Sequence, residues 1–159
     1  MTRLPQATRR RFLIETAALA GAVGIAVPLA VKPASATPAS MRAAIRKVVG
    51  EAALNKGKVK IDVPPLIENG NAVPLTISCE SPMTADDYVK AMHVFTEKNP
   101  QPNVVSVQLG PRSGRAAVST RIRLADTQKI VALAQMSDGS FWSDEVEVVV
   151  TLAACLEGT

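Results

Sequence analysis

Alternation of apolar and polar residues with a period of two runs through much of the sequence between residues 58 and 152. Val59, Ile61 and Val63, for example, are separated by charged residues, and this spacing places alternate side chains on opposite faces of a β-strand. Clusters of turn-forming residues interrupt the pattern, so that about seven short strands follow one another at intervals of about 8–14 residues. The arrangement favours a mainly β protein, an antiparallel β-sandwich, over repeated βαβ units.

Two segments give further information about strand pairing. Residues 129–136 are apolar on both faces, which predicts a central strand. Asn69-Gly70, inside the turn cluster of residues 68–71, is the strongest hairpin signal in the chain. The expected strands are residues 58–63, 73–80, 88–97, 104–109, 117–124, 129–136 and 145–152.

One packing helix is expected before the strands, within residues 37–57. Ser40 is a suitable N-cap, and Gly57 supplies the left-handed backbone conformation that commonly ends a helix. The apolar residues recur at helical spacing and form a single narrow stripe that fades through Leu54: Met41, Ala44, Ile45, Val48 and Val49.

Residues 1–36 are predicted to be a twin-arginine (Tat) export signal. Arg9 and Arg10 form the arginine pair within Thr8–Ile14, and an interrupted apolar stretch of residues 17–31 follows. Ala34-Ser35-Ala36 is a small-x-small cleavage site. The segment is too short and too interrupted for a stop-transfer helix, so we expect a periplasmic protein without stable membrane insertion; a retained membrane anchor is the alternative.

The basic character of the whole chain comes from this signal. Residues 1–36 hold five of the 18 Lys and Arg residues and one of the 14 Asp and Glu residues, so residues 37–159 carry 13 of each sign. A neutral domain with few aromatic residues offers no electrostatic basis for binding nucleic acid.

The chain has two cysteines, Cys79 and Cys155, and its expected compartment permits disulfides. Cys79 shares the apolar face of a predicted strand with Leu75 and Ile77, which favours a buried free thiol, although an internal Cys79–Cys155 bridge stays open.

Cys155 follows the last predicted strand, at the start of the final five residues of the chain. From Glu145 onward the alternation puts Val146, Val148, Val150 and Leu152 on the apolar face. The same alternation puts Ala153 and Cys155 on the polar face, and nothing after Leu152 is expected to tie the chain down. An exposed, reactive thiol is therefore one interpretation; a buried thiol and a disulfide are the others.

Other catalytic chemistry has little support. His93, the one histidine, lies on the apolar side of a predicted strand and is expected to be a satisfied core residue. The sequence has no Cys-x-x-Cys, haem-attachment or His-rich motif, so no cofactor and no metal are expected.

The motifs of the chain resemble those of the SoxY family, the sulfur-substrate carriers of the periplasmic thiosulfate-oxidising Sox system. The resemblance covers essentially the whole chain, including the export signal, the N-terminal helix and a terminal cysteine arm. Its most specific segments are Glu68-Asn-Gly-Asn-Ala-Val-Pro74, Asn99-Pro100, Ser119-Thr-Arg-Ile-Arg-Leu124 and Met136-Ser-Asp-Gly-Ser-Phe-Trp142.

The resemblance implies an immunoglobulin-like sandwich that forms a heterodimer with a SoxZ-like subunit. It also implies that Cys155 binds sulfur intermediates covalently and presents them to a c-type cytochrome, a sulfate-releasing hydrolase and a sulfur dehydrogenase. The expected organisation is a signal (residues 1–36), a helix (37–57), a sandwich carrier domain (58–152) and a cysteine arm (153–159).

The arm departs from the Gly-Gly-Cys-Gly-Gly pattern of the family. Here it is Ala153-Ala-Cys-Leu-Glu-Gly158, and glycine adopts backbone conformations that alanine and leucine rarely do. Leu156 adds bulk, and Glu157 adds a charge that opposes a thiolate or a bound thiosulfonate.

Two functions follow from these observations. The first is a non-enzymatic carrier of thiosulfate-derived sulfur on Cys155. The alternative is a binding or assembly subunit of a SoxYZ-like heterodimer, with the cysteine forming only an intermolecular disulfide. An independent thiol oxidoreductase is disfavoured because no second cysteine lies near Cys155 in the sequence.

Overall fold

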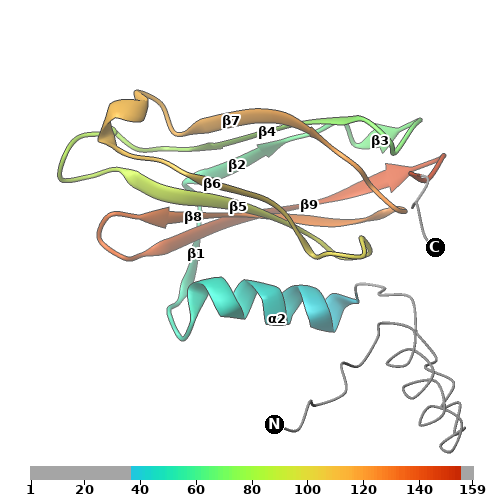
Figure 1. Cartoon of the computed structure of the whole chain (residues 1–159), viewed down its shortest axis with the longest axis horizontal. Helices are drawn as coiled ribbons and strands as arrows, with labels where there is room; N and C mark the ends of the chain where they lie inside the picture. Colours follow the sequence, from blue (N-terminus) through green and yellow to red (C-terminus); the bar gives the residue numbers. More distant parts are fainter. Residues whose placement is uncertain (1–36, 155–159) are drawn as a thin grey trace, which may run out of the picture. The chain divides into compact units, whose positions relative to one another are not determined.

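The computed structural model describes residues 37–154, which form two packed β-sheets and one helix (Figure 1). The predicted export signal of residues 1–36 lies outside the described residues, as does Cys155 with the rest of the C-terminus. The helix is α2 (Pro38–Val49). The strands are β1 (Leu54–Lys56), β2 (Val59–Asp62), β3 (Leu66–Ile67), β4 (Val73–Cys79), β5 (Val89–Thr96), β6 (Asn103–Gln108), β7 (Ala117–Ile122), β8 (Gln128–Met136) and β9 (Phe141–Val150), with a short 3-10 helix, η1 (Pro111–Ser113).

The larger sheet has the strand order β1-β9-β8-β5-β6, and β3 also pairs with β9. The smaller sheet has the order β2-β4-β7. Neighbours are antiparallel except β1 and β3, which both run parallel to β9. The prediction of a mainly β sandwich with one N-terminal helix is confirmed, with two short parallel pairs that the alternation did not indicate.

The main core fills the space between the two sheets. Leu75 and Ile77 of β4 face it from the smaller sheet, and Met92, Ile130 and Val148 face it from the larger one. Helix α2 packs on the opposite face of the larger sheet, where a second cluster forms (Figure 1). Strands β5 and β8 are consequently buried on both faces, which confirms residues 129–136 as part of a central strand.

The helix is shorter than predicted at its C-terminal end. Thr37, and not Ser40, is the N-cap; Ser40 closes a capping box by accepting from the Thr37 backbone N–H. The helix ends at Val49 because Gly50 follows with φ 64°. Residues 54–56, expected to prolong the helix, instead pair with Phe141–Ser143 of β9 as strand β1. A parallel pairing with so distant a segment leaves no local signature in the sequence.

The predicted hairpin at Asn69-Gly70 is wrong. Strand β3, which precedes it, pairs with β9, whereas β4, which follows it, pairs with β2 and β7. The turn therefore carries the chain from one sheet to the other. The backbone N–H and carbonyl of Gly70 consequently bind other segments, at Leu152 and Leu124.

Candidate functional site at the C-terminal end of β9

The chain stays attached to the sandwich after β9 ends at Val150. The Thr151 N–H donates to the Ile67 carbonyl at 2.9 Å, and the Thr151 hydroxyl donates to the carbonyls of Ile67 and Glu68 at 3.3 and 3.2 Å. Val149 donates likewise to Pro65 at 2.9 Å. These bonds continue the parallel pairing of β3 with β9.

Three further backbone hydrogen bonds hold the next residues against two loops. Gly70 N–H donates to the Leu152 carbonyl at 2.8 Å, and Leu124 N–H donates to the Gly70 carbonyl at 2.8 Å. Ala154 N–H in turn donates to the Leu124 carbonyl at 2.9 Å. We call these four residues, Gly70, Leu124, Leu152 and Ala154, the C-terminal clamp.

The clamp requires a residue without a side chain at position 70. A Cβ atom there would lie 2.4 Å from the Leu124 carbonyl oxygen, 2.8 Å from the Ala154 nitrogen and 3.2 Å from the Leu152 oxygen. All three are backbone atoms, which cannot turn aside as the end of a flexible side chain can. The φ angle of Gly70 is not positive, so close approach is what demands glycine here.

Burial departs from the alternation predicted for the end of β9 at one residue. Leu152, expected on the apolar face, is 61% exposed. Ala153 is exposed, as predicted, and Ala154 is 5% exposed and bonded to Leu124. The prediction that nothing after Leu152 ties the chain down is therefore wrong. Strand β9 ends at Val150, and backbone hydrogen bonds to Gly70 and Leu124 then hold the chain while the Leu152 side chain stays exposed.

Two buried polar side chains, Asn99 and Gln128, stabilise the backbone around Leu124 of the clamp. Asn99 donates through Nδ2 to the Arg123 carbonyl at 2.7 Å and accepts at Oδ1 from the Ala125 N–H at 3.0 Å. Gln128 Nε2 donates to the same Asn99 oxygen at 3.0 Å. Asn99 thus holds the residues on both sides of Leu124. The sequence predicted a loop at Asn99 and singled out Asn99-Pro100 as a motif, but it did not indicate this role.

Cys155, the predicted substrate-carrying residue, lies outside the described residues and directly follows Ala154 in the sequence. Of the predicted arm, residues 153–159, the structure describes Ala153, which is exposed, and Ala154, which is buried and hydrogen-bonded.

Cys79 is a free, buried cysteine, as its place in the alternation predicts. Its Sγ lies 4.0 Å from Met136 Sδ, and burial raises the pKa of the thiol to about 11. Cys79 ends the seven-residue strand β4 that begins at Val73, near the clamp. At about 3.3 Å per residue the thiol is therefore about 20 Å from that end of the sandwich.

His93 is a satisfied core residue, as predicted. Its Nδ1 lies 2.9 Å from the Ser106 hydroxyl on the neighbouring strand β6, and burial lowers the pKa of the imidazole. The ring also lies 6.3 Å from that of Phe95. Through these contacts His93 contributes to the packing around β5.

Residues 37–154 contain no group of three or more His, Cys, Asp or Glu side chains that could hold a metal ion. Within the same range no helix combines the length and apolar character needed to cross a membrane.

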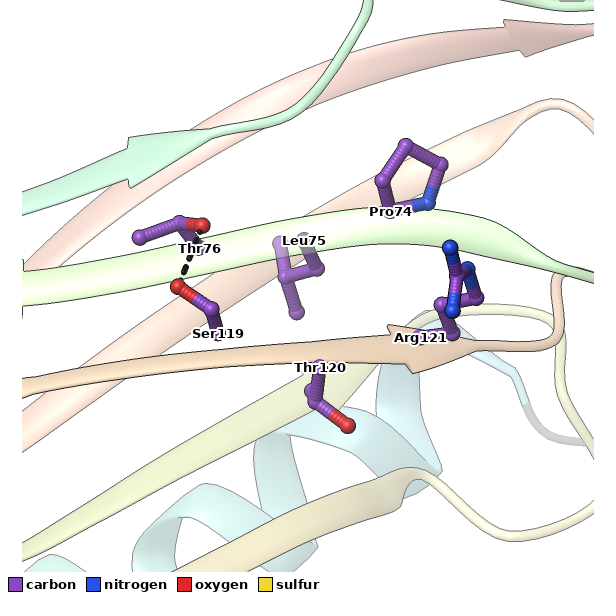
Figure 2. Close-up of a pocket in the computed structure, with 6 residues that line it drawn as sticks. All are labelled: Pro74, Leu75, Thr76, Ser119, Thr120 and Arg121. Carbon is purple, nitrogen blue, oxygen red and sulfur yellow. Dashed lines mark hydrogen bonds between the residues drawn. The ribbon is translucent and has the colours of Figure 1, made fainter.

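A shallow hollow of about 540 Å³ lies over β4 and β7 of the smaller sheet (Figure 2). The Thr76 and Ser119 hydroxyls point toward each other across it and are 2.9 Å apart. Arg121 is its one charged side chain, and its remaining lining residues are Pro74, Leu75 and Thr120. The hollow offers hydroxyl groups and a guanidinium but no thiol, imidazole or carboxylate.

The sequence matches the family model of the sulfur oxidation protein SoxY over residues 45–155. Among solved structures, the chain is similar to the sulfur carrier protein SoxY from Chlorobium limicola f thiosulfatophilum, with 29% identity and a TM-score of 0.60. That alignment covers 72% of this chain and 98% of the other. The comparison with curated proteins found no significant match.

Two superoxide reductases have a similar fold. For the neelaredoxin from Ignicoccus hospitalis the identity is 16% and the TM-score 0.53, covering 72% of this chain and 94% of that one. For the enzyme from Nanoarchaeum equitans the values are 12% and 0.52, covering 60% and 100%. At such identities the likeness concerns the fold alone.

Proposed function

Because the chain belongs to the SoxY family, we propose that it is a non-enzymatic periplasmic carrier that holds thiosulfate-derived sulfur covalently on Cys155. The observation that carries this proposal is the extent of the family match, which ends at residue 155 and so includes the cysteine. The other cysteine is unsuited to the role, since Cys79 is buried between the sheets and burial raises the pKa of its thiol to about 11.

The proposed role requires the Cys155 thiol to form and then release one S–S bond. In the loading step, the thiolate and thiosulfate join as Cys155–S–S–SO₃⁻, and two electrons pass to the ferric haems of a c-type cytochrome. In the release step, a hydrolase adds water across the S–SO₃ bond, freeing sulfate and two protons and leaving a persulfide on the cysteine. A sulfur dehydrogenase then oxidises the outer sulfur of the persulfide to a sulfonate, taking oxygen from water and passing six electrons to c-type haems. A second hydrolysis releases sulfate and returns the Cys155 thiol, so the carrier supplies only the thiol.

We further propose a SoxZ-like subunit as a stable partner. Val149, on the outward face of β9, is 47% exposed, and its register partner Leu66 on β3 is 56% exposed. Paired residues of neighbouring strands project on the same side of a sheet. Leu66 and Val149 thus form an exposed apolar pair, which is the kind of surface that a subunit interface covers.

The proposed domain organisation is an export signal of residues 1–36 followed by the helix, the sandwich and a cysteine arm. Arg9, Arg10 and the site Ala34-Ser35-Ala36 support export by the Tat route to the periplasm.

Mass spectrometry of the intact protein from cells grown on thiosulfate tests the carrier function. We expect adducts heavier by sulfur or sulfonate on the peptide that contains Cys155. A plain thiol, or only a protein–protein disulfide at Cys155, would contradict the proposal and favour an assembly subunit.

A further inference from the structure

We propose that a groove between strands β6 and β7 binds an extended, acidic segment of a partner protein. The groove has a volume of about 370 Å³ and is lined from two sides. One side is the segment 99–105, which runs into β6, and the other is the segment 120–123 at the end of β7. The β6–β7 groove, as we call it, would serve this role whether or not Cys155 carries sulfur.

Strand β6 offers a backbone edge that is open to pairing. It ends the larger sheet, and within residues 37–154 it pairs only with β5. Proteins commonly protect such edges by keeping them short or by placing charged residues or proline on them. Strand β6 is six residues long, Asn-Val-Val-Ser-Val-Gln, and contains neither a charged residue nor proline.

The other three end strands of the two sheets are better protected. Strand β1 has only three residues. Strand β2 contains Lys60 and Asp62 and leads into Pro64-Pro65, and β7 carries Arg121 near its end. The most favourable edge for an added strand is therefore that of β6.

The start of β6 supplies an apolar wall to the groove. In the register with β5, Val105 lies opposite Val94 and Asn103 lies opposite Phe95, so Val104 is an extra residue on β6. A bulge of this kind changes the direction of a side chain. Val104 and Val105 consequently both line the groove, and both are half-buried. Main-chain hydrogen bonds together with side-chain contacts of this sort are how an added strand is bound.

The opposite wall makes the groove selective for negative charge. Arg121 and Arg123 are exposed and line it, and neither has an ion-pair partner within residues 37–154. No Asp or Glu lines the groove, and Asp126, the next acid along the chain, is paired with Lys98 at 2.8 Å. A guanidinium binds a carboxylate through two parallel hydrogen bonds. Since the two arginines are two positions apart, acidic residues at alternate positions of an extended segment match their spacing of about 7 Å.

The groove is held in shape by a buried amide. Asn99 is 7% exposed and lines the groove, and its Nδ2 donates to the Arg123 carbonyl at 2.7 Å. The backbone that carries Arg123 is therefore fixed before any partner binds. Two motifs singled out in the sequence, Asn99-Pro100 and residues 119–124, thus meet at this groove.

The position of the groove leaves room for a second partner. The subunit proposed above covers Leu66 and Val149 at β9, whereas β6 is separated from β9 by β8 and β5 in the larger sheet. Both surfaces can then be occupied at once.

Fluorescence anisotropy with the purified protein tests the groove. The probe is a labelled peptide as long as β6, made of alternating glutamate and valine. Its matched control has glutamine in place of every glutamate, which keeps the length and the apolar residues. We expect the glutamate peptide to bind about five- to thirtyfold more tightly than the glutamine peptide, because two exposed ion pairs are formed. This comparison uses the parent protein and needs no variant.

The double substitution of Arg121→Gln and Arg123→Gln should weaken binding of the glutamate peptide by the same factor. The matched control is Arg112→Gln with Arg115→Gln. These two arginines are also exposed and remove the same charge, but they lie outside the groove, in η1 and between η1 and β7. Their substitution should leave binding within about twofold of the parent.

Amide hydrogen exchange shows where the peptide binds. With the peptide at about ten times its Kd, the outward-facing amides of residues 103–108 should exchange about tenfold more slowly, and those of residues 59–62 in β2 should not change. Protection of β6 supports strand addition. Protection elsewhere without β6 would overturn it.

Three further results would also overturn the proposal. They are no binding of the glutamate peptide, equal binding of the two peptides, and a dimer of this chain that protects β6 without peptide, which would assign the groove to a second copy. None of these measurements involves sulfur chemistry, so each leaves the carrier function intact. Equally, the absence of an adduct on Cys155 would contradict the carrier function and not the groove.

Discussion

The sulfur atoms of Cys79 and Met136 lie 4.0 Å apart between the two sheets. Cys79 is 7% exposed and Met136 is 2% exposed. A thiol in apolar surroundings keeps its proton, and burial raises the pKa of Cys79 to about 11 from the ordinary value of 9.0. The two cysteines of the chain should therefore differ in reactivity.

Alkylation of the native protein near neutral pH should modify Cys155 quickly and Cys79 only after denaturation. The reason is that the thiolate is the attacking species and that the Cys79 sulfur is covered. Peptide mass spectrometry with one reagent before unfolding and another afterwards distinguishes the two sites. Equal labelling in the native state would contradict the buried position of Cys79, and protection of both sites that reduction removes would indicate an internal bridge.

The stability of the protein should decline between about pH 9 and pH 11 through Cys79. The folded state keeps the thiol protonated to a higher pH than the unfolded state does, so this contribution is present below pH 9 and is lost as the pH rises toward 11. A shift of this size corresponds to a loss on the order of 2–3 kcal/mol. Urea unfolding at several pH values, compared between the parent and Cys79→Ala, isolates the effect, because both proteins share every other titrating group. Parallel pH profiles would contradict it.

Cys155→Ser should abolish sulfur loading and leave folding intact. We expect a change in the free energy of unfolding below about 0.5 kcal/mol, as for ordinary surface positions. Cys79→Ser is the informative contrast, because it places a hydroxyl in the apolar core and should cost about 1–3 kcal/mol. Thermal unfolding and intact mass measure the two properties. A large stability loss in Cys155→Ser would show a structural cysteine.

Leu66→Asp and Val149→Asp should each weaken binding to a SoxZ-like subunit at least about tenfold, because a carboxylate replaces an exposed apolar contact. Leu54→Asp is a suitable control, since Leu54 is also exposed and also lies next to β9, but at the opposite end. Size-exclusion chromatography of co-expressed proteins measures the complex. Loss of binding only in the Leu54 variant would place the interface elsewhere.

Replacing Leu156 and Glu157 by glycine should raise turnover with standard Sox enzymes. The change removes bulk and one negative charge next to Cys155 and leaves the clamp residues untouched. Steady-state thiosulfate oxidation with purified enzymes measures the gain. An unchanged rate would indicate that the altered arm suits different enzymes, and thiosulfate would then lose its place as the expected substrate.

The parts of the fold that the sequence predicts well are those with a local signature. In β4 the apolar face carries Val73, Leu75, Ile77 and Cys79, all buried as expected. Strand β8 is apolar on both faces from Ile130 to Ala134 and lies between two neighbours. Strands β1 and β3 were missed because they are only three and two residues long and owe their existence to β9, about 80 residues away.

The site is less predictable for a related reason. The cysteine is conspicuous in the sequence, but Gly70 resembles an ordinary hairpin glycine, and Leu124 resembles an ordinary core residue. The bonds that join them to Ala154 are between backbone atoms, which every residue carries. Nothing in the side-chain pattern therefore shows that they meet; the motifs that contain Gly70 and Leu124 marked both segments as unusual but did not indicate what joins them.

Strand β9 is held along one edge at both of its ends, by β1 at Phe141–Ser143 and by β3 at Val149 and Val150. This has a mechanical consequence. A partner that pulled on the C-terminus along the axis of β9 would load the β3–β9 hydrogen bonds in shear. These bonds would then resist the force together, and they would not break one after another from one end. Tension applied at the end of the chain would thus be borne by the rim of the sandwich before it reached the core.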